Sequence, residues 1–103
     1  MNFETYQLGK SLDSLNYRQV QDEILPLLEK GCNIVIDMTP CNYISSAGMR
    51  VLLYSRKVAA SKGLNIYLVG INEHVKDAMD ITGFSGFFEM FSTMEACLEK
   101  LKN

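Results

Sequence analysis

The sequence predicts a single α/β domain, in which a mostly parallel sheet of four to five strands is packed with about four helices. Two short runs rich in apolar and β-branched residues, 33–37 and 64–69, are typical of strands buried on both faces of a sheet. Helical periodicity follows each run, and strands that alternate with helices are joined by right-handed crossovers. A chain of 103 residues has room for one core, so residues 1–103 are expected to form one domain.

The first third of the chain predicts one strand and one helix. Residues 3–8 alternate weakly between two faces, which indicates a strand. Residues 14–16 offer capping side chains for a helix that extends to Lys30. Its apolar stripe consists of Tyr17, Val20, Ile24, Leu27 and Leu28. Pro26 lies inside this helix and is expected to kink it or interrupt its hydrogen bonds.

The chain then changes from strand to helix around two serines. A polar loop at 39–42 leads to a helix from Ser46 to about Lys62. Ser45 and Ser46 are typical of a helix start, where a hydroxyl accepts from the free N–H groups of the first turn. One face of this helix holds Gly48, Val51, Leu52, Ser55, Val58 and Ala59, and the other holds Met49, Arg50, Leu53, Tyr54, Arg56 and Lys57. The second set is more apolar than a surface without a partner requires.

The last third predicts a strand at 64–69, a short helix at 73–81, and a final helix capped by residues 92–93. Between the two helices lie four aromatic residues, Phe84, Phe87, Phe88 and Phe91. Aromatic residues at this density are more often packing than a cofactor site, so this segment is interpreted as core plus one edge strand.

Composition argues against several classes of function. The formal net charge of −2 argues against a nucleic-acid surface, which shows a clustered basic face. The three cysteines and His74 fit neither a disulfide framework nor a zinc site. The first residues show no basic segment before an apolar core, and no apolar run approaches the ~18 residues that span a bilayer, so we expect neither a signal segment nor a membrane span. We expect a cytoplasmic protein, monomeric or weakly oligomeric, without metal or cofactor.

A serine at a helix N-terminus suits a hydroxyl that gains and loses a phosphate. Free N–H groups and partial positive charge tolerate the phosphate. Its charge of about −1.5 to −2 instead acts on any partner that binds this surface. The alternative is that Ser45 and Ser46 are ordinary capping residues, and spacing alone leaves both interpretations open.

Residues 37–39, Asp-Met-Thr, and 43–53, Tyr-Ile-Ser-Ser-Ala-Gly-Met-Arg-Val-Leu-Leu, resemble the signature of the STAS family, the domain of bacterial anti-sigma factor antagonists. Weaker matches extend the resemblance over nearly the whole chain, at 11–13, 63–70, 81–84 and 87–91. Family members usually have two strands before the Leu-Asp pair, whereas the residues up to Leu12 leave room for one. In members regulated by phosphorylation an Asp precedes the acceptor serine, and this chain has Ser45 there.

The resemblance implies a partner switch. The acceptor serine lies two residues before the motif glycine, a position that Ser46 occupies. The unphosphorylated domain would bind an anti-sigma factor that is also a serine kinase, which would phosphorylate Ser46 and break the complex, and a PP2C-type phosphatase would reverse this. The expected partner-binding residues are Ser45, Ser46, Met49, Arg50, Leu53 and Tyr54. The alternative, slightly favoured by Ser45 in place of Asp, is an accessory subunit that binds the ATPase of an ABC lipid transporter.

An enzymatic function is not expected. Ser46, His74 and Asp37 could be nominated as a hydrolase triad, but a nucleophile elbow needs a glycine where this chain has Ile44. His74 stands among polar residues at a helix start, which is typical of an exposed histidine. The chain also lacks a glycine-rich nucleotide-binding motif.

Overall fold

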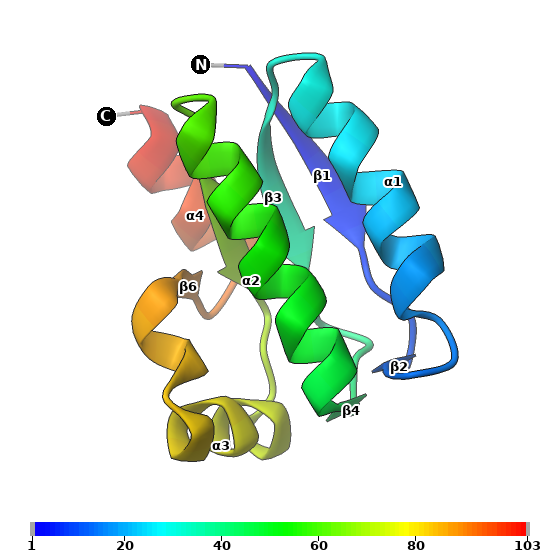
Figure 1. The fold of residues 1–103 in the computed structure, drawn as a ribbon. Helices are drawn as coiled ribbons and strands as arrows, with labels where there is room; N and C mark the ends of the chain where they lie inside the picture. Colours follow the sequence, from blue (N-terminus) through cyan, green and yellow to red (C-terminus); the bar gives the residue numbers. More distant parts are fainter. Residues whose placement is uncertain (1, 103) are drawn as a thin grey trace.

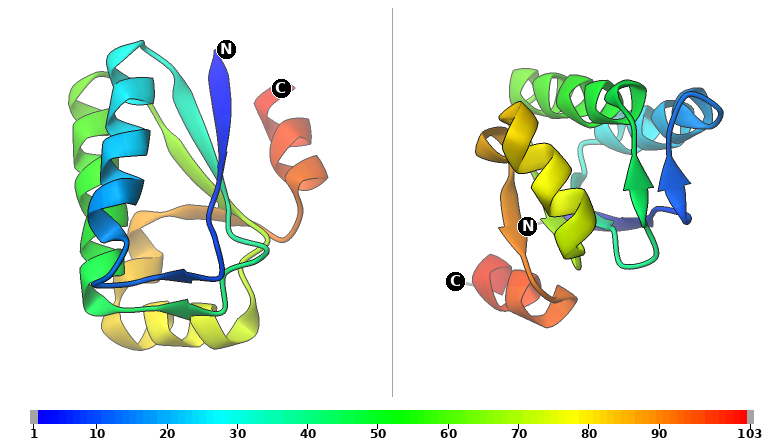
Figure 2. Two further views of the ribbon diagram at one scale, coloured as in Figure 1. Left: turned by 90° about the vertical axis from the view of Figure 1, so that its right-hand side faces the viewer. Right: turned by 90° about the horizontal axis from the view of Figure 1, so that it is seen from below.

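The structure is a computed structural model that describes residues 2–102 and has three layers. Helices α1 (Tyr17–Glu29) and α2 (Ser46–Ser61) lie side by side on one face of the central sheet, and α4 (Met94–Lys102) covers the other face (Figures 1 and 2). Helix α3 (Glu73–Thr82) lies across the lower end of the molecule in Figure 1. The predicted α/β fold class is confirmed.

The central sheet has four strands, all parallel. Its order is β1-β3-β5-β6, with bounds Phe3–Gln7, Asn33–Asp37, Ile66–Val69 and Glu89–Phe91. Ile34 and Ile36 belong to the main core under α1 and α2, and Val35 packs with Val69 and Cys97 of the smaller core under α4. The run at 33–37 is apolar throughout because helices cover both faces of β3.

Two short strands were missed by the sequence analysis. β2 (Ser11–Leu12) and β4 (Tyr43–Ile44) pair in parallel and form a second, two-stranded sheet. The expectation that only one strand precedes the first helix is therefore wrong, and the sequence did not predict the strand at 43–44 that follows the loop at 39–42. A two-residue strand carries no periodicity, so only the tertiary pairing defines it.

Most helix boundaries agree with the prediction. α1 runs through Pro26 to Glu29 without ending there, because a proline in the last turn removes only one hydrogen bond and its own carbonyl still accepts from the N–H of Lys30 at 3.1 Å. α2 ends as expected before Gly63, whose φ of 72° lies in the left-handed region that glycine tolerates.

The phenylalanine segment is only partly core. It forms a 3-10 helix, η1 (Phe84–Phe87), and the edge strand β6. Phe84, Phe88 and Phe91 are half-buried against the two cores. Phe87 is 49% exposed, and its ring lies 5.7 Å from the Arg56 guanidinium carbon.

The start of α2 is seated directly on the small β2/β4 sheet. Gly48 is buried in the first turn, and a Cβ built on it would lie 2.8 Å from Leu12 Cγ and 3.0 Å from Ile44 Cγ1, and closer still to the Leu12 carbonyl oxygen. Real Cβ atoms do not approach backbone this closely. Gly48 is therefore required by contact with β2 and β4, not by its backbone angles.

Replacing Gly48 by alanine is expected to lower the free energy of unfolding by roughly 1–3 kcal/mol, because the added methyl group overpacks the β2/β4 contact. This loss should appear although alanine is the better helix former by ~1 kcal/mol. Urea denaturation measures the effect. Gly86→Ala is the matched control, since a Cβ there meets nothing within 4 Å. Equal stability of Gly48→Ala and wild type would contradict the close approach.

Candidate functional site

The site is built where β4 passes into α2. We call this region, residues 11–16, 43–46 and the first turn of α2, the serine end. It lies at the opposite end of the molecule from both termini (Figure 1). The β2/β4 pairing holds it together, because Leu12 lies opposite Ile44 and the Ser45 N–H donates to the Leu12 carbonyl at 3.0 Å.

Ser45 is the N-cap of α2. Its backbone is extended, with φ −93° and ψ 174°, and its Oγ accepts from the N–H of Gly48 at 3.2 Å. Its carbonyl accepts the first intrahelical bond, from Met49, at 2.9 Å. The half-buried Ser45 hydroxyl is therefore committed to the cap.

Ser46 is the first residue of α2 and is exposed. Among the hydrogen bonds of residues 2–102, none involves its side chain. The two adjacent serines thus have different environments, and the exposed hydroxyl of Ser46 is the accessible one.

The loop that leads to the serine end is fixed by Asp37. Its carboxylate accepts from the Thr39 hydroxyl at 2.6 Å, the Thr39 N–H at 3.0 Å and the Gln7 amide at 3.2 Å. Burial alone would raise the pKa of Asp37, but the bonds from Thr39 and Gln7 outweigh it and hold this pKa below its ordinary value. Asp37 and Thr39 therefore act as a structural turn lock.

Met49 does not lie on the accessible surface, so its expected place in a partner contact is wrong. It is 5% exposed and belongs to the main core, and its sulfur lies 3.5 Å from the Thr82 hydroxyl oxygen. Helical spacing placed Met49 beside Leu53. Spacing along one helix could not show that Thr82, at the end of α3, lies against Met49. Its burial comes from its place in the main core, with Thr82 at the end of α3 as one of its neighbours.

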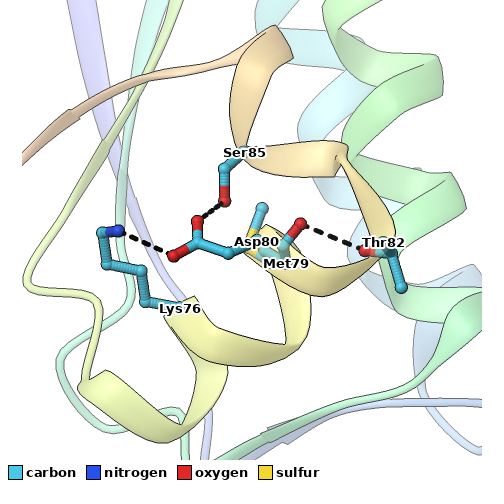
Figure 3. Close-up of polar contacts among 5 residues, drawn as sticks. All are labelled: Lys76, Met79, Asp80, Thr82 and Ser85. Carbon is cyan, nitrogen blue, oxygen red and sulfur yellow. Dashed lines mark hydrogen bonds and ion pairs between the residues drawn. The ribbon is translucent and has the colours of Figure 1, made fainter.

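The corner between α3 and η1 is held by polar contacts (Figure 3). The Asp80 carboxylate accepts from Lys76 at 2.9 Å and from the Ser85 hydroxyl, which joins the two helices. The Thr82 hydroxyl has one proton to donate, and its possible acceptors are the Ala78 carbonyl at 2.9 Å and the Met79 carbonyl at 3.1 Å. These contacts join the end of α3 to η1, and Thr82, which lies beside Met49, belongs to this corner.

The other predicted partner-binding residues of α2 do reach solvent. Arg50 and Tyr54 are exposed and Leu53 is half-buried. We call Ser46, Arg50, Leu53 and Tyr54 the docking face. Arg50 and Tyr54 also line a groove of about 460 Å³ between α2 and α1, whose α1 side is formed by Ser14, Tyr17 and Gln21. The α1 side was missed, because Tyr17 was assigned to the core stripe.

A second feature that sequence reasoning missed is Leu15, which is 93% exposed. It lies in a loop held by Asp13, whose carboxylate accepts from the Leu15 N–H at 2.9 Å, and by Asn16, whose amide bonds Asp13 and the Ser11 carbonyl. Tyr43, also exposed, belongs to the neighbouring β4. The serine end thus exposes two apolar side chains, Leu15 and Tyr43, and hydrogen bonds of Asp13 and Asn16 hold the loop that carries Leu15.

The nominated hydrolase residues are not joined. His74 is exposed, the Asp37 carboxylate is engaged by Thr39 and Gln7, and no hydrogen bond within residues 2–102 links Ser46, His74 and Asp37. In the same part of the chain, no cluster of three or more histidine, cysteine or acidic side chains is suited to a metal ion. None of the helices described there combines the length and apolarity that crossing a bilayer requires.

Comparison with known proteins gives consistent matches. A family model described as the STAS domain matches residues 2–97. The chain is 30% identical to BtrV of Bordetella bronchiseptica, named as a candidate anti-sigma factor antagonist, over 88% of this chain and 79% of that protein.

Two solved structures show the same fold. The crystal structure of a candidate anti-sigma factor antagonist from Thermotoga maritima has a TM-score of 0.86 at 21% identity, covering 96% of this chain and 88% of that chain. The Bacillus cell fate determinant SpoIIAA, solved in its phosphorylated form, has a TM-score of 0.71 at 14% identity, covering 94% and 88%.

The different environments of the two serines predict different effects on stability. Ser45→Ala is expected to lower the free energy of unfolding by about 1 kcal/mol, because the first-turn N–H of Gly48 loses its acceptor. Ser46→Ala, the matched control one residue away, should leave it unchanged. Urea denaturation of both variants tests this. A larger loss in Ser46→Ala would reverse the assignment of cap and free hydroxyl.

Asp37 predicts a pH dependence of stability. Its pKa is lower in the folded state, so the ionised carboxylate stabilises the fold above its ordinary pKa, and this stabilisation is lost as the pH falls through the folded pKa. Asp37→Asn should therefore destabilise the protein at neutral pH, and its difference from wild type should shrink below about pH 4. Denaturation at several pH values measures it, with Asp77→Asn on the exposed face of α3 as control. If the difference in free energy of unfolding between Asp37→Asn and wild type does not change with pH, the ionised Asp37 carboxylate does not stabilise this turn.

Proposed function

This chain belongs to the STAS domain family, and on that premise we propose that it is an anti-sigma factor antagonist controlled by reversible phosphorylation of Ser46. In its unphosphorylated form it binds an anti-sigma factor, which is also a serine kinase, through the docking face. The sigma factor that the anti-sigma factor had held is then released and directs transcription. Sigma factors act on cytoplasmic RNA polymerase, so the exchange takes place in the cytoplasm.

The observation that carries this proposal is the exposed Ser46 hydroxyl beside a serine that already caps the helix. A kinase must reach a free hydroxyl without unfolding the segment that bears it. Because Ser45 supplies the cap, modification of Ser46 leaves the helix start intact. The solved phosphorylated form of SpoIIAA supports the compatibility of this fold with a phosphate.

Ser45 stands where phosphorylated family members have Asp, and its geometry supports the same role. Asp and Ser are both good N-cap residues, since either side chain accepts from a first-turn N–H. Here the Ser45 hydroxyl accepts from Gly48. The neutral cap also leaves the first turn without an acidic side chain, so a phosphate on Ser46 meets no carboxylate on α2.

The phosphate acts on the partner more than on the fold. It adds a charge of about −1.5 to −2 at the positive end of α2, where the helix dipole favours it. The same charge faces an anti-sigma factor surface that fits the neutral hydroxyl, and burying it there is unfavourable unless a cation pairs with it. Phosphorylation thus separates the complex, and a PP2C-type phosphatase restores binding. The chain needs no catalytic group or cofactor of its own, since the kinase brings ATP and magnesium.

The proposal predicts which proteins bind immobilised wild-type protein and how Ser46 affects that binding. From an extract of the native cell, wild type should retain an anti-sigma factor of the kinase type. Incubation with that kinase and ATP should place phosphate on Ser46 and not on Ser45, as read by mass spectrometry.

Titration calorimetry then compares wild type, Ser46→Ala, Ser46→Asp and Leu53→Ala, with circular dichroism as the control for folding. Ser46→Asp should weaken binding, and Leu53→Ala should cost ~1 kcal/mol or more, whereas Ser46→Ala should bind like wild type. Phosphate only on Ser45 would refute the acceptor assignment. Recovery of a transporter ATPase or permease instead of an anti-sigma factor would favour the accessory-subunit function.

A further inference from the structure

The groove between α1 and α2 has a definite chemical character. Its α2 wall carries Arg50 and Tyr54, and its α1 wall carries Tyr17 and Gln21. At about 460 Å³ it is large enough for a few side chains and too open to enclose a small molecule. No carboxylate lines it.

Its charge contrasts with that of the whole chain. The protein has a formal net charge of −2, yet α2 contains three cations, Arg50, Arg56 and Lys57, and no acidic residue. Arg50 and Lys57 also line a second, shallow depression, together with Leu53 and Tyr54. The ion pairs found within residues 2–102 involve Lys76 and Lys100, so the Arg50 guanidinium has no carboxylate partner there.

A second guanidinium lies on the α1 side. Arg18 donates from Nε to the Tyr17 hydroxyl at 3.1 Å, and its guanidinium carbon lies 5.8 Å from the centre of the Tyr17 ring. Asp22, one turn further along α1, attracts the Arg18 guanidinium electrostatically and lines a separate depression with Leu25 and Pro26. The groove is thus lined by Arg50 and two tyrosines, and a second arginine, Arg18, contacts one of these tyrosines.

We propose that this groove receives an acidic segment of the anti-sigma factor, with its carboxylates toward Arg50 and Arg18 and its apolar side chains on Tyr17 and Tyr54. This inference rests on the proposed function and names the chemistry of the partner. Guanidinium groups bind carboxylates in a bidentate manner, and tyrosine and arginine are the side chains most often found as interface anchors. Nucleic acid is a poorer occupant, because its affinity comes from many phosphate contacts and this groove offers few cations.

The location of the groove connects it to Ser46. Ala47, the next residue, lines the groove, and Arg50 follows Ser46 by four residues, which places the two side chains on the same side of α2. A phosphate on Ser46 therefore competes for Arg50 and repels an acidic segment. The basic groove makes the binding of an acidic partner sensitive to phosphorylation.

Calorimetry with the anti-sigma factor recovered by wild type tests the inference. The proteins are wild type, Arg50→Gln, Arg50→Lys, Arg18→Gln and the matched control Lys62→Gln, which removes a charge just beyond the far end of α2. Each is titrated at about 0.05 M and about 0.5 M NaCl, since salt screens exposed charges. Circular dichroism checks the folding of each variant.

Arg50→Gln is expected to weaken binding about tenfold at low salt and to reduce the salt dependence, as loss of a charged contact does. Arg50→Lys should restore part of the affinity, Arg18→Gln should show a smaller loss, and Lys62→Gln should match wild type. If the anti-sigma factor binds all five proteins equally, the acidic segment is refuted and the proposed function stands. If wild type recovers no anti-sigma factor from the extract, both fail. If Arg50→Gln instead abolishes self-association in sedimentation without the anti-sigma factor, the occupant is a second copy of this chain and the inference is wrong.

Discussion

The contact between the first turn of α2 and the β2/β4 pair is the constraint on which the site depends. Gly48 permits it, because any side chain at that position would collide with Leu12 and Ile44. Close approach aligns the Ser45 N–H with the Leu12 carbonyl and leaves the Ser45 hydroxyl at the right distance for the cap. With both groups of Ser45 used, Ser46 is the residue that faces solvent. Backbone packing thus decides which of two identical hydroxyls is available.

In the proposed function, the groups that stabilise the serine end differ from the groups that bind the partner. The groups that hold the serine end, the cap of Ser45 and the turn lock of Asp37 and Thr39, are engaged within the fold. The groups assigned to binding, Ser46 and Arg50, are exposed and make no ion pair within the described residues. A charge can therefore be added at Ser46 with little cost to folding, since the helix N-terminus tolerates an anion.

The charge of α2 differs in sign from the net charge of the whole chain. A net charge of −2 keeps the whole chain weakly acidic, while the outward side of α2 is basic. Complementary charge mainly improves the rate and specificity of association, and it is easily altered by one covalent anion. The proposed regulation would therefore depend less on buried area than on the sign of the charge on a few exposed side chains.

The sequence by itself determined the fold class, the buried strands at 33–37 and 64–69, and the serine helix, because apolar periodicity and capping residues act locally. Tertiary structure alone decided the β2/β4 pairing, since two residues at each strand are too few to carry a period. It also decided the burial of Met49, which helical spacing placed with Leu53 but which belongs to the main core. The groove was likewise invisible in the sequence, because its two walls lie on helices about thirty residues apart that only packing brings together.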